Sequence, residues 1–301
     1  MINLVIDQRR KDLDGFEVGR VLPYAKRRMV GPFVFFDHMG PVDMPAGISR
    51  KVDVRPHPHI GLSTVTYLFA GEIMHRDSVG SEAPIHPGEV NWMTAGKGIT
   101  HSERFERAHA QGDHLHGIQA WIALPKEHEE TEPGFSHHEG AGLPTWREAG
   151  LSGRLIAGSA WGLQAEVNTF SPLFYAHIEL APGARLSMPE NYVERALYVA
   201  SGSVEHEGRR YETGQMLVLE RGAAMFSAPL DLGAPTTLMA LGGEPVGERF
   251  LYWNFVSSSR ERLEQAKADW RAGRMKLPDL DHDEFIPLPD EPPKPVPNPM
   301  S

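Results

Sequence analysis

Apolar and polar residues alternate in short runs along the chain, and Gly or Pro separates most runs from the next. In the first half the runs read "FEVGRVLP", "GPFVFFDHM", "STVTYLFAG", "EVNWMTAG" and "GIQAWIALP". In the second half they read "RLIAGS", "FYAHIEL", "ALYVASGSVEH", "QMLVLERG" and "TTLMALGG". Short strands with regular turn residues are typical of β-sandwiches and β-barrels. Helices do not alternate with these strands, which argues against a Rossmann-type sheet, so the pattern predicts an all-β protein.

The two halves of the chain are loosely alike. "TVTYLFAGEIMHRDS" and "ALYVASGSVEHEGRR" each predict a strand, a Gly turn and a second strand. A polar stretch with several Gly and Pro residues, 128–150, is the expected linker between the halves. We therefore expect one β-domain that is duplicated, with domains at 1–140 and 141–301.

One segment near the C-terminus has a helical pattern, "SSRERLEQAKADWRAG" at 258–273. Leu263, Ala266 and Trp270 share one face, which we expect to pack on a sheet. Ser258 and Glu261 are spaced as a capping box, and Gly273 is a typical stop. The tail "DEPPKPVPNPMS" is rich in proline, which predicts an extended and mobile segment. Helix and tail are assigned to the second domain.

Composition excludes several classes of function. The 301 residues include no cysteine, which rules out a disulfide scaffold, a thiolate metal site and a cysteine nucleophile. The formal net charge is −10 and no basic stripe is present, which argues against direct binding of nucleic acid. The first residues lack an apolar core of signal-peptide length, and no run approaches a membrane span. We expect a cytoplasmic protein without a membrane partner.

Two histidine pairs carry the candidate chemistry. In "RPHPHIGL", His57 and His59 are two residues apart, and in "GKGITHSERF", His101 and Glu103 have the same spacing. On a strand, this spacing directs both side chains to one face, so two adjacent strands could close four ligands on one ion. Three imidazoles and a carboxylate suit Fe(II), Mn(II), Ni(II), Co(II), Cu(II) or Zn(II). The alternative is a turn that merely contains histidines.

Other motifs are weaker. His114 and His116 have the same spacing, and together with His137 and His138 they are expected as surface or loop histidines. "TAGKGIT" lacks the spacing of a phosphate-binding loop, because a glycine follows Lys97 where that loop needs Ser or Thr. No G-x-S-x-G motif supports a serine hydrolase.

The sequence resembles the pirin family of the cupin superfamily. The resemblance is carried by "GPFVFFDHMGP", "RPHPHIGLSTVTYLFAGEIMHRDS", "GEVNWMTAGKGITHSE", "HGIQAWIALP" and "ERFLYWNFVSSSRERLEQAKADW". It implies two cupin jelly-roll barrels, stacked face to face, with metal only in the first. It also implies His57, His59, His101 and Glu103 as the metal ligands. The second half has no H-x-H pair at the corresponding place, so its barrel is expected to be metal-free.

The resemblance leaves two functions open. Some pirins are similar in activity to quercetin 2,3-dioxygenases, which implies a small aromatic substrate, O₂ and Glu103 as catalytic base. A different aromatic enol could replace the flavonol. Other pirins resemble metal-dependent co-regulators, which implies a transcription factor or metabolic enzyme as protein partner and no turnover. A ligand-sized cavity at the metal would favour the enzyme.

Two details of the enzyme reading remain expectations. Fe(II) is the expected ion, although the ligand set also accepts the other divalent metals named above. Phe35, Phe36, Trp92 and Trp121 are candidate walls of a substrate cavity.

Overall fold

The computed structural model describes residues 1–12 and 17–289, and within them the chain divides into two compact units. Of the described residues, the first unit contains 34–140, 246–289 and the short stretches 11–12 and 17–18. The second unit contains residues 1–10, 19–33 and 141–245. Each unit is therefore assembled from separate parts of the chain.

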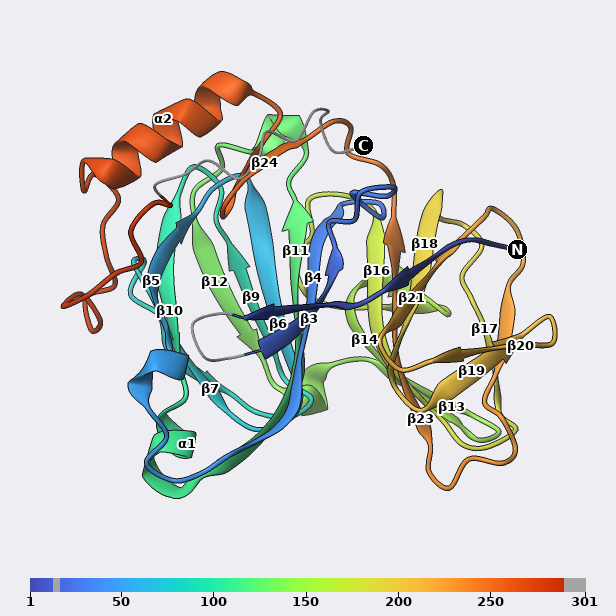
Figure 1. Ribbon diagram of the computed structural model, residues 1–301. Coiled ribbons are helices and arrows are strands. Elements are labelled where there is room, and N and C mark those ends of the chain that lie inside the picture. Colours follow the sequence, from blue (N-terminus) through green and yellow to red (C-terminus); the bar gives the residue numbers. More distant parts are fainter. Residues whose placement is uncertain (13–16, 290–301) are drawn as a thin grey trace. The chain divides into compact units, whose positions relative to one another are not determined.

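Two β-sheets, whose strands lie mostly in the first unit, enclose its core (Figure 1). The larger sheet has the strand order β12-β9-β6-β11-β4-β3-β2, and the smaller has the order β5-β10-β7-β8. The larger sheet consists of β2 (Arg9–Asp12), β3 (Glu17–Leu22), β4 (Phe33–Met44), β6 (Leu62–Ala70), β9 (Val90–Thr94), β11 (Asp113–Ala123) and β12 (Gly134–His138). The smaller consists of β5 (Val54–His59), β7 (Ile73–Asp77), β8 (Glu82–Ile85) and β10 (Ile99–Arg104).

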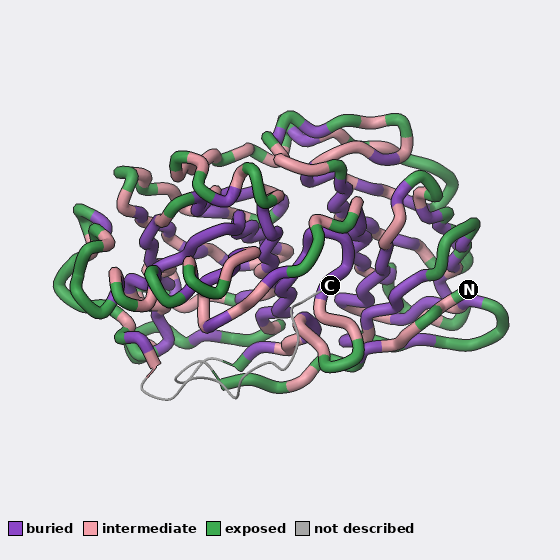
Figure 2. The backbone as a smooth tube through the Cα atoms, turned by 90° about the horizontal axis from the view of Figure 1, so that it is seen from above, coloured by how far each residue is buried: buried purple, intermediate pink, exposed green. Residues whose placement is uncertain are grey.

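Buried positions follow the strands of both units, and exposed positions gather at the connecting turns (Figure 2). In the first unit, Leu68, Phe105 and Leu115 belong to an apolar cluster between the sheets. This burial is what the alternating pattern of the sequence predicts for strands with one face toward a core.

Short helices and a hairpin complete the first unit. They are η1 (Arg50–Val52), α1 (Glu106–Gln111), η2 (Lys126–His128), η3 (Gly140–Gly142), β24 (Phe250–Tyr252), β25 (Phe255–Ser257) and α2 (Arg260–Arg271). The 3-10 helix η3 crosses the boundary between the units, because its last two residues belong to the second unit. None of the helices among the described residues is both long enough and apolar enough to cross a membrane.

Helix α2 has the predicted buried face but begins one residue later than expected. Leu263, Ala266 and Trp270 are buried against an apolar cluster that includes Ile60 and Phe255. The N-cap is Ser259, whose hydroxyl accepts the Arg262 N–H. The predicted cap, Ser258, instead donates its hydroxyl and its backbone N–H to the buried carboxylate of Glu129. The prediction was wrong at this residue because a tertiary partner competes for the serine.

The second unit also contains two sheets. One has the order β1-β21-β18-β23-β16-β14-β13, with β15 paired to β14, and the other has the order β17-β22-β19-β20. Its strands are β1 (Ile2–Asp7), β13 (Thr145–Glu148), β14 (Leu151–Ala160), β15 (Leu163–Gln164), β16 (Leu173–Leu180), β17 (Arg185–Ser187), β18 (Glu194–Ser201), β19 (Ser203–His206), β20 (Arg209–Glu212), β21 (Gln215–Leu219), β22 (Met225–Ser227) and β23 (Thr236–Gly243).

The terminal segments differ from the expected domain contents, although the boundary near residue 140 is where the chain passes between units. Strand β1 pairs with β21 and so joins the second unit, whereas α2 packs on the first. The expected linker also forms structure, because β12 pairs with β9 and β13 pairs with β14. The predicted extended tail, 290–301, lies outside the described residues.

Candidate metal centre

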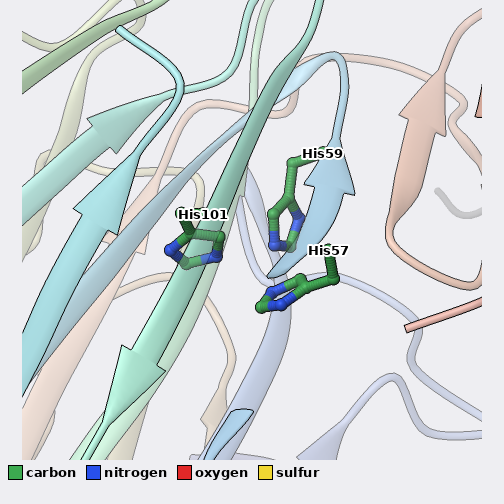
Figure 3. A group of neighbouring side chains, drawn as sticks. All are labelled: His57, His59 and His101. Atoms are coloured by element: carbon green, nitrogen blue, oxygen red, sulfur yellow. The ribbon is translucent and has the colours of Figure 1, made fainter. Parts of the chain in front are cut away.

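Three of the four predicted ligands meet inside the first unit. His57 and His59 lie on β5 and His101 on β10, and His57 is directly opposite His101 in the antiparallel pair. One ring nitrogen from each histidine lies within 4.8 Å of the others, and the three rings face one another in Figure 3. The three residues are only 5%, 1% and 1% exposed, respectively. The sequence prediction of a histidine cluster from two distant strands agrees with this geometry.

The local sequence explains why β5 can present two imidazoles inward. Pro56 and Pro58 alternate with His57 and His59, so the prolines occupy the opposite face of the strand. A proline cannot donate to a ladder, but β5 is at the edge of its sheet, where the missing N–H groups cost little.

Hydrogen bonds leave lone pairs inside the cluster. The Nδ1–H of His57 donates to the Arg55 carbonyl at 2.9 Å, so the lone pair of a neutral His57 is on Nε2. The Nε2 atoms of His59 and His101 are buried and have no hydrogen-bond partner among the described residues. Buried polar atoms without a partner are uncommon in folded proteins. Two such atoms beside the lone pair of His57 Nε2 fit a transition metal that accepts imidazole ligands.

Burial keeps these histidines neutral. It lowers the pKa of His57 to about 4, with the Arg55 carbonyl opposing the shift and His75 adding to it. Burial likewise lowers the pKa of His59 and of His101 well below the usual value, and neighbouring imidazoles strengthen both effects. The desolvated rings therefore do not need to lose a proton before they bind a cation near pH 7.

Glu103 is not a member of the close histidine group in this structure. It follows His101 by two residues on β10, but the strand pairing with β5 is irregular between these two positions and places Glu103 opposite Val54. The group of mutually close ligand atoms contains the three histidines and not the Glu103 carboxylate. Burial alone raises the pKa of Glu103 to about 7. Its role as fourth ligand remains a prediction.

An aromatic row borders the histidines. Trp121 packs edge-on against His59 with ring centroids 5.0 Å apart, and Phe35 stacks on Trp121 at 3.9 Å. Trp121 on β11 is directly opposite Thr64 on β6. Directly opposite residues of paired strands point to the same face of the sheet, so Thr64 faces the histidines as Trp121 does. Two of the four expected wall residues therefore face the site.

The other two expected wall residues face away from it. Phe36 follows Phe35 directly on β4, and Trp92 precedes Met93, the cross-strand partner of Thr64. Consecutive residues on a strand point to opposite faces, so Phe36 and Trp92 lie on the outer side of the sheet. The prediction was wrong for these two rings because it used residue type without strand register.

Sequence reasoning missed His75 and Asp77, which lie behind His101 on β7. His75 Nδ1 is 3.4 Å from His101 Nδ1, and His75 Nε2 is 2.9 Å from Asp77 Oδ2. Burial acts to raise the pKa of Asp77, but hydrogen bonds from His75 and Ser81 outweigh it and leave this pKa below its usual value. The sequence did indicate this pair, because His75 and Asp77 in "HRD" are two residues apart, as are His57 and His59 and also His101 and Glu103.

The other histidines are not all in loops. His114 is exposed and bonds to Asp43, but His116 lies on β11, with its Nε2 at 2.8 Å from that of the buried His38. His137 and His138 lie on strand β12, where His137 is exposed, as expected for a surface histidine, and His138 is half-buried.

Known proteins resemble this chain over nearly its whole length. The family model for Pirin matches residues 15–122, and the model for the Pirin C-terminal cupin domain matches residues 175–276. A pirin-like protein of Caulobacter vibrioides is 61% identical over 291 residues, which cover 96% of this chain and 100% of that protein. This chain belongs to the pirin family.

Two further proteins that resemble this pirin are named after an enzymatic activity, quercetin 2,3-dioxygenase. A protein of Pseudomonas aeruginosa, provisionally named a quercetin 2,3-dioxygenase, is 38% identical over 269 residues, 89% of this chain and 82% of the relative. A crystal structure of a protein named quercetin 2,3-dioxygenase from Acinetobacter baumannii matches with a TM-score of 0.86 at 30% identity. That match covers 96% of both chains. The predicted all-β fold of two cupin domains is confirmed by these matches together with the strands described above.

In the second cupin unit of this pirin, apolar side chains occupy the place of the histidines. Strands β17 and β22 pair as β5 and β10 do, and Leu186 is directly opposite Phe226. Both residues are buried in an apolar cluster that fills this unit. This packing supports the prediction that the second barrel is structural and metal-free.

Proposed function

We propose that this pirin is a mononuclear metal-dependent dioxygenase of the quercetinase type, which opens a flavonol or a similar aromatic enol with O₂. The observation that carries the proposal is the convergence of three buried, neutral imidazoles, in which the Nε2 atoms of His59 and His101 have no hydrogen-bond partner among the described residues. Fe(II) is the proposed ion, and Mn, Ni, Co, Cu or Zn would also suit the donors. The names of the two dioxygenase relatives support the same reaction class.

His57, His59 and His101 would hold the ion, with Glu103 as the proposed fourth ligand. A divalent ion there supplies Lewis acidity that lowers the pKa of a substrate hydroxyl and, if redox-active, electrons for dioxygen. The protein supplies the base: Glu103, with a pKa of about 7, can accept a proton near neutral pH and later release it. Its place on β10, two residues after His101, would keep that proton near the proposed ion.

The aromatic row supplies a surface for a flat substrate. Phe35 and Trp121 are already stacked and almost fully buried, so their ring faces are positioned without further ordering. Preorganised aromatic surfaces favour flat ligands because little side-chain entropy is lost on binding.

A metal-dependent regulatory protein is the alternative, and one observation favours it. A cavity of about 400 Å³ in the first unit is lined by Ser78, Lys97, Thr100 and residues after α2, and one of about 350 Å³ lies in the second unit. Neither cavity is lined by the three histidines. The ligand-sized cavity expected for an enzyme is thus not one of these two.

Turnover after metal reconstitution decides between the two functions. The apo-protein is loaded anaerobically with Fe(II), Mn(II), Ni(II), Co(II) or Cu(II) and mixed with quercetin in air, while flavonol absorbance and carbon monoxide are followed. We expect metal-dependent turnover that is lost in His101→Ala. The matched control is His177→Ala, because His177 bonds to Glu179 two residues away on a strand of the second unit. Stoichiometric metal binding without turnover for all five ions would contradict the dioxygenase proposal.

A further inference from the structure

A buried chain of three side chains extends from the metal centre into the smaller sheet. His101 lies on β10 and contacts His75 on the neighbouring strand β7, and His75 in turn contacts Asp77 two residues further along. All three residues are at most 5% exposed. Water therefore does not compete for these contacts, and the donors and acceptors must match one another.

The carboxylate of Asp77 determines the direction of the hydrogen bonds. Its Oδ1 accepts the backbone N–H groups of Val79 at 3.0 Å and Ser81 at 2.9 Å. Its Oδ2 is left for His75 and, as a carboxylate oxygen, can only accept. His75 therefore carries a proton on Nε2.

The order of protons then follows along the chain. As a neutral imidazole, His75 has one donor and one acceptor, so a proton on Nε2 makes its Nδ1 the acceptor. The partner of that acceptor is Nδ1 of His101, at 3.4 Å, which must be the donor. With its proton on Nδ1, His101 has its lone pair on Nε2, the buried atom without a partner.

We propose that Asp77, acting through His75, is a positioning residue that fixes His101 in the tautomer with Nε2 free for the metal. This inference rests on the proposed metal site. Second-layer partners of metal-bound histidines set ring orientation and tautomer in this manner. His57 is fixed in the same sense by a different partner, the Arg55 carbonyl, so two ligands present Nε2 before any ion binds.

Packing keeps the middle of the chain in place. Phe135 on β12 stacks on the His75 ring with centroids 4.4 Å apart and the planes inclined by only 16°. A flip of the His75 ring would have to disturb this stack and break the bond to Asp77. The packing therefore holds Nδ1 of His75 toward His101 and Nε2 toward Asp77.

Asp77→Asn is the informative variant because it retains the shape of the side chain and reverses the polarity. The amide oxygen of the variant would keep the two backbone N–H groups, which leaves its NH₂ group facing His75. His75 would then accept at Nε2 and donate from Nδ1, and His101 would have to accept at Nδ1. The proton of His101 would move to Nε2, where it blocks the metal.

The experiment measures tautomer and affinity separately. Long-range ¹H–¹⁵N correlation spectra of the apo-protein, labelled at histidine and assigned with His101→Gln, report which ring nitrogen carries the proton. Competition with a chromophoric chelator gives the Ni(II) dissociation constant. We expect Nδ1–H for His101 in the wild type, Nε2–H in Asp77→Asn, and Ni(II) binding weakened roughly 10- to 100-fold in that variant.

Two further variants separate positioning from general loss of structure. His75→Phe preserves the stack on Phe135 and removes the acceptor without imposing the wrong tautomer, so we expect a smaller loss of affinity than in Asp77→Asn. Glu179→Gln, the control, removes the negative charge beside His177 in the second unit and should leave Ni(II) binding and the His101 signals unchanged.

The outcomes are distinguishable. An Nε2–H tautomer for His101 in the wild-type apo-protein overturns the inference, and this spectrum needs no variant. An unchanged tautomer and affinity in a folded Asp77→Asn would overturn it as well. Failure of the wild type to bind any divalent metal would instead remove the proposed metal site on which the inference rests.

Discussion

Replacing Glu103 by Gln is expected to change the number of protons released when the metal binds. The four predicted ligands differ in how far each is protonated at pH 7 before the metal binds. Burial lowers the pKa of His57 to about 4 and the pKa values of His59 and His101 well below normal, so these rings are neutral at pH 7. Burial raises the pKa of Glu103 to about 7, so its carboxyl group is partly protonated there.

The magnitude follows from these pKa values. If Glu103 becomes a ligand, it must lose its proton, and the histidines contribute almost none. The carboxyl group then releases about half a proton per metal at pH 7, about 0.9 at pH 6 and almost none at pH 8.5. The amide in Glu103→Gln releases none, so the difference between the two proteins should rise as the pH falls.

Calorimetry provides the measurement. Titrations of Ni(II) into apo-protein, at one pH but in buffers of different ionisation enthalpy, give the proton number as the slope of the observed enthalpy. Water bound to the metal can also release a proton, and the comparison with Glu103→Gln subtracts that contribution. Glu179→Gln, a change to a carboxylate of the second unit, should behave as the wild type.

Equal proton numbers in wild type and Glu103→Gln from pH 6 to pH 8.5 would refute the reasoning. If the affinity for Ni(II) also remained unchanged, Glu103 would not be a ligand, in keeping with its place outside the histidine group. If the affinity fell while the proton number did not change, Glu103 would bind the metal but would already be ionised in the apo-protein.

Two further predictions concern stability. The folded pKa of His57 is lowered from 6.5 to about 4, so the unfolded chain binds its proton first and the apo-protein should lose stability as the pH falls from 6.5 to 4. This residue accounts for up to about 3 kcal/mol of that loss, and urea unfolding of His57→Gln should show a curve shallower by that amount; an identical curve would contradict the assignment. Phe226→Ala in the second unit removes a fully buried ring and should destabilise that unit by roughly 3–5 kcal/mol. Its Ni(II) affinity should equal that of the wild type, and a metal affinity that fell with stability would show that the second barrel is not merely structural.

Much of this pirin could be predicted from local patterns. The alternation of apolar and polar residues is a property of each strand, because successive side chains point to opposite faces. For that reason the all-β class, the inward pair His57 and His59, and the buried face of α2 were all predicted correctly. The helix cap was wrong by one residue because Glu129, distant in the sequence, binds Ser258.

Tertiary structure decided what depends on pairing between distant strands. Strand register placed Phe35 and Trp121 beside the histidines and turned Phe36 and Trp92 away. The folded chain also brought three imidazoles together in a close group that does not include Glu103, whose partner on β5 is Val54 after an irregularity in the pairing. The sequence by itself determined which residues can share a face, because that is set by the period of two along a strand. Only the folded chain determined which faces meet, because register depends on contacts across the whole barrel.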